Sequence, residues 1–499
     1  MYTMTFIRKI KRGKYIYLAE VENNWENGKV KQKHIRYVGK ELDGERKLSG
    51  SIERAKIDKV SIYGPLLMID SVAKELGLSE LLGKNGEYLL SLAYGHCVDP
   101  NSVKKLTDWF ERTDIHSLLE IPDVTYKKLL ESLEGFDGEY GHFVQEKIFK
   151  RIQERLNLKE EGYFYDVTNA YFYGLKCSIA KKKKKPKSMN LPQIEIGLAV
   201  TKEYGIPIFH KVFEGNIHDS KTLQDILLMF KEHKIENATI VWDRGVTSEI
   251  NIKEACDIGF NVICGLALNN NIKNTIEEII FSPDFNSIKH RVRLKNAVFY
   301  VKKIQYKYGN LKGYLYICLN EKEKHDIKER RYDQLNSALK LLSNNKPIKD
   351  GLKKYIRGKY LNYKEIENAE KFDGVSAIFS TNNISPKEVV PAYFEKDRVE
   401  KAFRTLKGLL EMDKIRFWLK DKVKAHIFIC YLSYLLLSII DYKLRNTEFN
   451  SANALEIMES IYKVHITDPI TRNTFSKTVT YTKKQEIILK AINKNLIKT

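Results

Sequence analysis

Residues 161–268 alternate strand-like and helical patterns, and this alternation constrains the fold more than any other feature of the chain. Aromatic and β-branched runs predict three strands, two of them joined by a turn at residues 202–205. An amphipathic helix with Ser220 as its expected N-cap comes next, followed by a strand, a short helix and a last strand. These segments are, in order, residues 163–174, 192–215, 220–233, 238–245, 251–259 and 261–268.

Two aspartates lie within this strand pattern. Asp166 stands in the middle of the run YFYDVTNAYFYG, and Asp243 follows the hydrophobic strand ATIVW. A carboxylate in a buried strand is costly unless it is paired or binds a metal. For either aspartate alone, a capped or salt-bridged side chain is the commoner case. Together, on neighbouring strands of one sheet, they indicate a site for Mg²⁺. The order of strands and helices around them is that of an RNase H-like mixed sheet.

A third acid lies in the segment YFEKDRVEKAFRTLK, which predicts one amphipathic helix. Tyr393, Lys396, Glu400 and Lys407 are spaced by 3, 4 and 7 residues, so a continuous helix places them within an arc of about 60°. An ordinary amphipathic helix with i,i+4 pairs is the alternative. The adjoining apolar stripe, which would dock the helix on the sheet, consists of Val399, Phe403, Leu406 and Leu410.

The remaining segments suggest further domains around this core. Short alternating stretches around an Asn/Gly turn predict an N-terminal β-hairpin unit, and a helical region rich in Lys and Arg follows, which fits DNA-end recognition and a scaffold equally well. We expect an α/β protein whose RNase H-like core is interrupted by an insertion with its own β-rich part, then helical. The expected boundaries are 1–58 (hairpin unit), 59–160 (helical region), 161–268 (core), 269–374 (insertion), 375–445 (core) and 446–499 (C-terminal helices).

Composition narrows the partners of this chain. The 85 Lys and Arg residues exceed the 64 Asp and Glu residues by 21, which favours a polyanion such as double-stranded DNA. A solvated Lys-rich surface is the alternative, and no lipidation signal supports a membrane surface. The apolar run 427–440 has 14 uncharged residues, whereas a bilayer span needs about 20, so we expect a buried helix.

Other compositional features restrict the chemistry and the compartment. No Gly-rich phosphate-binding motif occurs, so no nucleotide cofactor is expected. No signal peptide is evident at the N-terminus, and the six scattered cysteines form neither a disulfide framework nor a zinc-ligand pattern. These features fit a reducing cytoplasm.

Several motifs together resemble one large group of bacterial insertion-sequence DDE transposases. The box Tyr-x2-Arg-x3-Glu-x6-Lys of that group is matched by Tyr393, Glu400 and Lys407, with Lys396 where the group usually has Arg. A lysine offers a point charge and lacks the bidentate phosphate grip of arginine. The resemblance runs from about residue 160 to 445 and includes, in the same order, YDVTN, GLAVTKEYGIPIFHKVFEGNIHD, WDRG, FDGVSAIFSTN and KVKAHIFICYLSYLL.

This resemblance implies a catalytic centre built from Asp166, Asp243 and Glu400, which would hold two Mg²⁺ ions, with Mn²⁺ as a substitute. In-line displacement at phosphorus needs such a pair of ions, and we expect Asp166 to bridge them. Arg244 could contact a phosphate or pair with a neighbouring acid, and we favour the second. Further DNA contacts are expected from Tyr393, Lys396, Lys407 and, in the basic loop, Lys181 and Lys183.

The resemblance also implies a biological role, namely cleavage at terminal inverted repeats and strand transfer into target DNA. It implies a homodimer in the synaptic complex, in the cytoplasm of a bacterium. The alternatives are a nuclease of the same fold that does not join strands, and a catalytically silent DNA-binding descendant. Members that form DNA hairpins hold a flipped base with an aromatic residue of the insertion, where this chain has no Trp. The candidates there are Phe299, Tyr300, Tyr306 and Tyr308.

Three further polar residues have structural roles in our interpretation. His218 and Asp219 follow the third strand, where a turn is a simpler role than metal ligation. His426 lies on an apolar helix, and we expect a core histidine whose hydrogen bonds are satisfied.

Overall fold

A computed structural model describes residues 5–26, 29–42, 45–48, 56–134, 138–156, 162–174, 176–183, 191–295, 297–467 and 474–497. Backbone contacts divide the chain into two units. The first comprises Met1–Asp70, Thr107–Asp123 and Ala452–Thr499, and the second comprises Ser71–Leu106 and Val124–Ser451. The predicted domain boundaries remain predictions.

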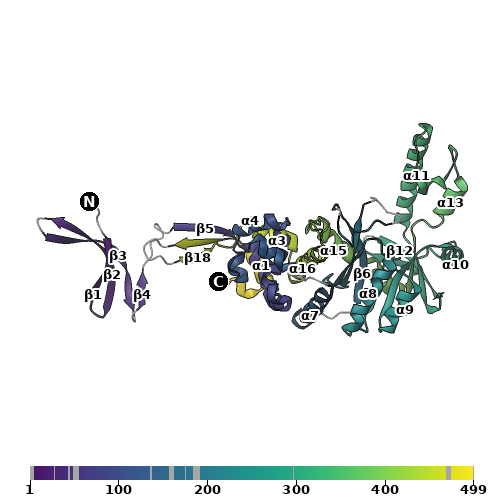
Figure 1. Cartoon of the computed structure of the whole chain (residues 1–499). Coiled ribbons are helices and arrows are strands. Elements are labelled where there is room, and N and C mark those ends of the chain that lie inside the picture. The colour runs from purple at the N-terminus through teal and green to yellow at the C-terminus, as the bar shows by residue number, and fades with distance from the viewer. Residues whose placement is uncertain are drawn as a thin grey trace. The chain divides into compact units, whose positions relative to one another are not determined.

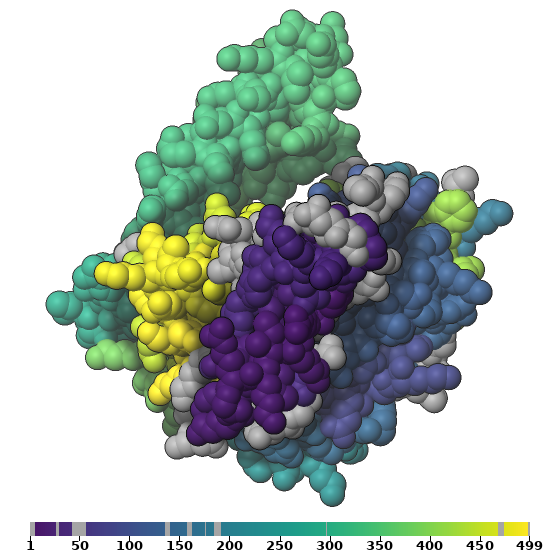
Figure 2. Space-filling view, turned by 90° about the vertical axis from the view of Figure 1, so that its left-hand side faces the viewer, coloured from purple at the N-terminus to yellow at the C-terminus, as the bar shows by residue number. Residues whose placement is uncertain are grey.

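The first unit contains two antiparallel sheets. Strands β1 (Thr5–Arg12), β2 (Tyr15–Glu26), β3 (Lys29–Leu42) and β4 (Glu45–Leu48) form one sheet in chain order, which is the purple surface in Figure 2. Glu26 of β2 faces Lys29 of β3, so the predicted N-terminal hairpin is confirmed. The second sheet has the order β18-β17-β5. Its strands are β5 (Lys56–Ile62), β17 (Tyr462–Thr467) and β18 (Thr474–Thr478).

The expectation that residues 446–499 are helical is wrong for the middle of that segment. Helices α17 (Ser451–Met458) and α18 (Lys483–Ile492) are present, but β17 and β18 lie between them in sequence. The alternating, β-branched text of β17 pairs with β5, about 400 residues earlier in the chain. Such a distant partner cannot be identified from local periodicity.

The helical region predicted between residues 59 and 160 is present, and its helices are distributed over both units. They are labelled in part in Figure 1. Their bounds are α1 (Gly64–Leu76), α2 (Leu78–Leu82), α3 (Gly86–Val98), α4 (Val103–Glu111), α5 (Ile115–Leu119), α6 (Tyr126–Ser132) and α7 (Gly138–Leu156).

A nine-stranded mixed sheet forms the centre of the second unit, in the order β11-β12-β13-β16-β10-β9-β6-β7-β8. Strand β9 pairs in parallel with β6 and with β10, and the other neighbours are antiparallel. The five strands predicted between residues 161 and 268 are confirmed. They are β6 (Gly162–Tyr171), β7 (Gln193–Thr201), β8 (Pro207–Glu214), β9 (Thr239–Trp242) and β10 (Asn261–Leu266).

The insertion does not have a separate β-rich part, contrary to expectation. Its strands β11 (Arg291–Leu294), β12 (Ala297–Tyr308) and β13 (Leu311–Leu319) extend the core sheet, because β13 pairs with β16 (Val375–Ser380). Only the following segment has a small core of its own, around Leu335 and Ile366. This segment, green in Figure 2, contains α11 (Glu321–Ser343), α12 (Asp350–Lys353), β14 (Ile356–Arg357), β15 (Tyr360–Leu361) and α13 (Tyr363–Glu370).

One face of the sheet is covered by α8 (Asp219–Glu232) and α9 (Glu249–Asp257), which share a buried aromatic core with the strands. Helix α10 (Asn270–Ile280) also packs into this core. The N-cap of α8 is His218 and not Ser220, so the cap lies two residues earlier than predicted. His218 and Asp219 thus lie at the start of a helix and not in a turn as predicted.

The buried helix predicted around residues 427–440 is confirmed as part of α16 (Lys420–Leu444). This helix is long and apolar enough to cross a membrane, but 94% of its most apolar window is buried within the protein. Ser433 donates a hydrogen bond to the carbonyl of Ala93 in α3, and Tyr431 donates one to the carbonyl of Ile208 in β8. The helix therefore ties α3 to the sheet.

His426 of α16 is a core histidine, as predicted. It is buried, and its Nε2 lies 3.1 Å from the carbonyl oxygen of Met412. Burial lowers the pKa of His426 to about 3, and burial likewise lowers the pKa of His210 to about 3 and that of His96 to about 4. All three imidazoles are neutral in the folded protein near neutral pH.

These lowered pKa values predict acid sensitivity. Below about pH 6.5 the unfolded chain takes up protons that the folded chain excludes, so each such histidine reduces the free energy of unfolding by up to about 1.4 kcal/mol per pH unit. We expect His426→Gln, which keeps a donor for Met412, to be less stable than wild type at neutral pH but less sensitive to acid. Urea unfolding between about pH 7 and pH 5 measures this. Parallel stability curves for the two proteins would contradict it.

Candidate active site

The parallel pairing of β6 and β9 brings the two predicted aspartates together. Tyr165 of β6 faces Trp242 of β9 in the register, and Asp166 and Asp243 directly follow these two residues. Side chains alternate along a strand, so Tyr163 and Tyr165 enter the core beneath α8 while Asp166 faces the other side of the sheet. The alternation of side chains along β6 therefore determines that Asp166 faces away from α8.

Asp166 is partly buried in an acidic environment. Burial raises the pKa of Asp166 to about 6, the negative charges of Asp243 and Glu400 contribute in the same direction, and the charge of Lys396 opposes them. These influences show that the three predicted carboxylates and one predicted lysine lie within electrostatic reach of each other. A group of carboxylates that repel each other is stabilised by a cation.

Asp243 is held by two residues of the predicted box. The hydroxyl of Tyr393 donates to Oδ1 of Asp243 over 2.9 Å, and Nζ of Lys396 lies 2.8 Å from the same oxygen. Burial alone would raise the pKa of Asp243, but the hydrogen bond and charge of Lys396 outweigh it and lower the pKa. Lys396 is therefore the counter-ion of Asp243.

The predicted single helix is wrong, because the box is divided between two helices. Tyr393 lies in α14 (Pro386–Phe394), and Glu400 and Lys407 lie in α15 (Asp397–Lys407). Around Lys396 the backbone makes tighter bonds, with its N–H on the carbonyl of Tyr393 and its own carbonyl accepting from Val399. This turn places Lys396 beside Asp243 and lets α15 run in a different direction from α14.

Helix α15 docks on the sheet through the predicted apolar stripe. Val399, Phe403 and Leu406 are buried, as is Leu410 just beyond the helix, and α15 contacts β6. The carboxylate of Glu400 stays exposed beside this interface. It is thus available to a ligand while the helix that carries it is fixed.

Lys407 lies in a different electrostatic environment from Lys396. Burial lowers the pKa of Lys407, and the charges of Asp413, Glu195 and Tyr171 partly oppose the decrease. These neighbours place Lys407 near the edge of β6 and β7 instead of at Asp243. The structure therefore brings Tyr393 and Lys396 onto Asp243 and sets Lys407 apart.

The two predicted lysines of the basic loop differ in role. Nζ of Lys183 lies 2.9 Å from Glu195 and 3.0 Å from Asp219, so it links the loop to β7 and to the start of α8. Lys181 pairs through its backbone with Gln193 and has an exposed side chain. Lysines 184, 185 and 187 lie outside the described residues.

Arg244 is exposed and forms no ion pair with the residues that the structure describes. The expectation that it pairs with a neighbouring acid is therefore not met among them. Its position directly after Asp243 leaves its guanidinium available to another anion.

Gly265 is a site residue that the sequence analysis missed. A Cβ atom on this residue of β10 would lie 2.2 Å from the hydroxyl of Tyr393, so only glycine leaves room for the Tyr393–Asp243 hydrogen bond. A glycine inside a predicted strand is a signal for such a close approach.

Trp418 is a second missed candidate. Its side chain is 65% exposed and lies beside Gly174, just beyond β6. An exposed tryptophan in a basic protein is a signal for base stacking.

Of the aromatic residues predicted for this role, Phe299 is buried and its ring stacks on that of Phe394 with centroids 4.4 Å apart. The other three, Tyr300, Tyr306 and Tyr308, are partly buried against the core.

The three carboxylates form an all-oxygen donor set, which suits a hard divalent cation such as Mg²⁺. Residues 150–436 match the family model described as the transposase DDE domain, which spans more than half of the chain and includes Asp166, Asp243 and Glu400.

The chain is a DDE transposase. Membership implies polynucleotidyl transferase activity in DNA transposition, and the family generally uses divalent metal ions. Among solved structures, this transposase is similar to the piggyBac transposase in its synaptic complex with hairpin DNA, with 12% identity, a TM-score of 0.39 and coverage of 80% of each chain. No curated protein matches the sequence.

The close contact at Gly265 makes a first prediction for the transposase. Gly265→Ala should push Tyr393 away from Asp243 and reduce metal-dependent DNA cleavage by about tenfold or more, since a small misplacement in an active site is costly. Gly351→Ala is the matched control, because a Cβ there meets no atom within 4 Å. Equal cleavage rates for the two variants would contradict the positioning role of Tyr393.

The raised pKa of Asp166 makes a second prediction. Above a pH of about 6 this carboxyl group is ionised, and below it a metal ion must displace a proton. Calorimetric affinity for Mn²⁺ should therefore fall by up to about tenfold for each pH unit below about 6. An affinity that is unchanged between about pH 7 and pH 5 would show that Asp166 is no ligand.

Proposed function

We propose that this transposase mobilises a bacterial insertion sequence of the group with the Tyr-x2-Arg-x3-Glu-x6-Lys box. It cleaves double-stranded DNA at terminal inverted repeats and transfers the ends into target DNA, as a homodimer in the synaptic complex, in the bacterial cytoplasm. The observation that carries this proposal is the convergence of Tyr393 and Lys396 on Asp243, beside Asp166. Two elements of the box thus act on a carboxylate that lies far from them in sequence.

Asp166, Asp243 and Glu400 would hold two Mg²⁺ ions. The ions would activate the attacking oxygen and stabilise the leaving oxygen of an in-line displacement. The backbone fixes the positions of the three carboxylates. Asp166 lies on β6, Asp243 directly follows β9, and Glu400 lies on a docked helix.

Lys396 would exchange between two anions in this mechanism. Its Nζ lies 2.8 Å from Asp243, and it would also hold a DNA phosphate beside the reacting centre. Tyr393 stays buried and continues to orient Asp243. The departure from arginine suits this exchange, because a compact ammonium group moves between two anions more easily than a bidentate guanidinium.

DNA phosphates beyond the cleaved bond would contact Lys407, Arg244 and Lys181. Arg244 and Lys181 are exposed, and Lys407 is partly exposed with a lowered pKa. Lys183 would act indirectly, since its pairs with Glu195 and Asp219 hold the basic loop in place. For base stacking we favour Trp418 over Phe299, Tyr300, Tyr306 and Tyr308, because it is more exposed than these four residues.

The alternative functions differ in the products they form. A nuclease of this fold would cut DNA ends without joining them, and a silent DNA-binding protein would do neither. The three carboxylates are intact and electrostatically coupled, which speaks against the silent protein.

The test uses the full chain, Mg²⁺ and a DNA fragment that carries the repeats flanking the gene. We expect wild type to cut and join, and Asp243→Asn and Glu400→Gln to lose both activities by about 1000-fold or more. The control is Asp350→Asn, an acid on α12 whose side chain is 93% exposed. Cutting without joining would favour the nuclease, and an Asp243→Asn variant as active as wild type would refute the site.

A further inference from the structure

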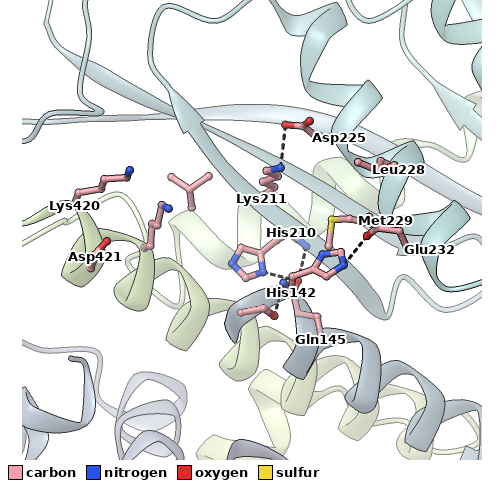
Figure 3. A pocket seen from close by; sticks show the side chains of 13 residues that line it. His142, Gln145, His210, Lys211, Asp225, Leu228, Met229, Glu232, Lys420 and Asp421 are labelled. Atoms are coloured by element: carbon pink, nitrogen blue, oxygen red, sulfur yellow. Dashed lines mark hydrogen bonds and ion pairs between the residues drawn. The ribbon is translucent and has the colours of Figure 1, made fainter. Parts of the chain in front are cut away.

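A second cluster of metal-ligand side chains lies at the C-terminal end of α8, whereas the N-terminal end of that helix lies beside the catalytic region. His142 projects from α7, Glu232 is the last residue of α8, and His233 caps that helix. Figure 3 shows His142 and Glu232 facing each other across the gap between the two helices. None of these residues belongs to the site described above.

The distances within this cluster fit a single bound ion. Nε2 of His142 lies 3.1 Å from Nε2 of His233 and 3.0 Å from Oε2 of Glu232, and the ligand atoms of all three residues lie within 4.8 Å of each other. Ligands about 2.0–2.2 Å from a tetrahedral ion are about 3.3–3.6 Å apart. The two pairs that include His142 are therefore close to coordination spacing, and each histidine presents the same ring nitrogen to the other.

The surroundings of His233 support a ligand role. Its other ring nitrogen, Nδ1, lies 3.4 Å from a carboxylate oxygen of Glu146. When Nδ1 donates its proton to Glu146, the lone pair of Nε2 points toward His142 and Glu232. A carboxylate behind a histidine is the usual outer contact of a histidine that binds a metal.

The cluster is also open to solvent on one side. His142 and Glu232 line a cleft of about 690 Å³, together with Gln145 and Met229 (Figure 3). Three protein ligands and one open position make a coordination sphere that water can complete. The cleft provides the route by which an ion enters.

We propose that His142, Glu232 and His233 bind one borderline transition-metal ion, Zn²⁺ being the best fit, separately from the catalytic Mg²⁺. Two imidazoles and one carboxylate favour Zn²⁺, whereas Mg²⁺ favours oxygen ligands alone. Helix α8 has 14 residues and is about 21 Å long. Its first residue, Asp219, lies near Gly245 beside the catalytic region, so the two metal sites are at opposite ends of the helix.

Such an ion would clamp α7 to α8. Helix α7 precedes β6, the strand that carries Asp166, and α8 packs on one face of the sheet that contains β6. The clamp would stabilise the frame of the active site without contacting DNA. Cysteine spacing gave no sign of zinc, because this cluster uses histidine and glutamate from segments about 90 residues apart.

The test is a calorimetric titration of Zn²⁺ into metal-stripped, full-length protein without an affinity tag, in excess Mg²⁺ to occupy the catalytic carboxylates. We expect one Zn²⁺ per chain, a melting temperature raised by several degrees, and tetrahedral Co²⁺ absorption after substitution. His142→Ala and Glu232→Gln should weaken Zn²⁺ binding by about tenfold or more. His325→Gln is the matched control, an exposed histidine on α11, and should bind Zn²⁺ as wild type does.

His142 and Glu232 are partly exposed, with side chains 29% and 49% accessible, so these substitutions are compatible with folding, and circular dichroism of the metal-free variants checks this. If wild type binds no Zn²⁺ in excess Mg²⁺, the cluster is only a hydrogen-bonded group and the proposal is overturned. Equal binding by His142→Ala and His325→Gln would overturn it as well. DNA cleavage by metal-stripped protein in Mg²⁺ tests the catalytic site separately.

Discussion

The parallel pairing of β6 with β9 is the constraint on which the catalytic arrangement depends. It places Asp166 and Asp243 at matching positions on adjacent strands, where two negative charges would repel each other without a cation. Lys396, held 2.8 Å from Asp243, supplies one positive charge. Burial raises the pKa of Asp166, with the charges of Asp243 and Glu400 adding to the increase, whereas Lys396 lowers the pKa of Asp243.

The break between α14 and α15 follows from this constraint. A continuous helix could dock its apolar stripe on the sheet or bring Tyr393 and Lys396 onto Asp243, and the tight turn at Lys396 allows both. Buried Tyr393 passes over β10 at a point where Gly265 has no side chain. Tyr393 of α14 therefore positions Asp243, and α15 carries Glu400.

Local patterns in the sequence predicted much of the core and of the site. The strands around Asp166 and Asp243 were predictable because aromatic and β-branched residues are concentrated there, and the stripe of Val399, Phe403 and Leu406 predicted how α15 docks. Features that depend on distant partners were not predictable. The pairing of β13 with β16 joined the insertion to the core sheet, and β17 found its partner at β5.

Side-chain roles failed to be predicted for the same reason. Lys183 was expected to contact phosphate, but its position is determined by Glu195 and Asp219 from other elements. The cluster of His142, Glu232 and His233 likewise exists only because α7 packs near the end of α8. The helix break at Lys396 is local, yet periodicity could not reveal it, since residues 393–407 satisfy a helical pattern throughout.

The central claim is that Asp166, Asp243 and Glu400 form one divalent-metal site. Anomalous X-ray diffraction from crystals of the full chain with DNA ends and Mn²⁺ tests it most directly. We expect Mn²⁺ peaks between these three carboxylates, with Lys396 moved away from Asp243 and Tyr393 still bonded to it. Mn²⁺ that binds elsewhere, or Lys396 still paired with Asp243 in the loaded complex, would contradict it.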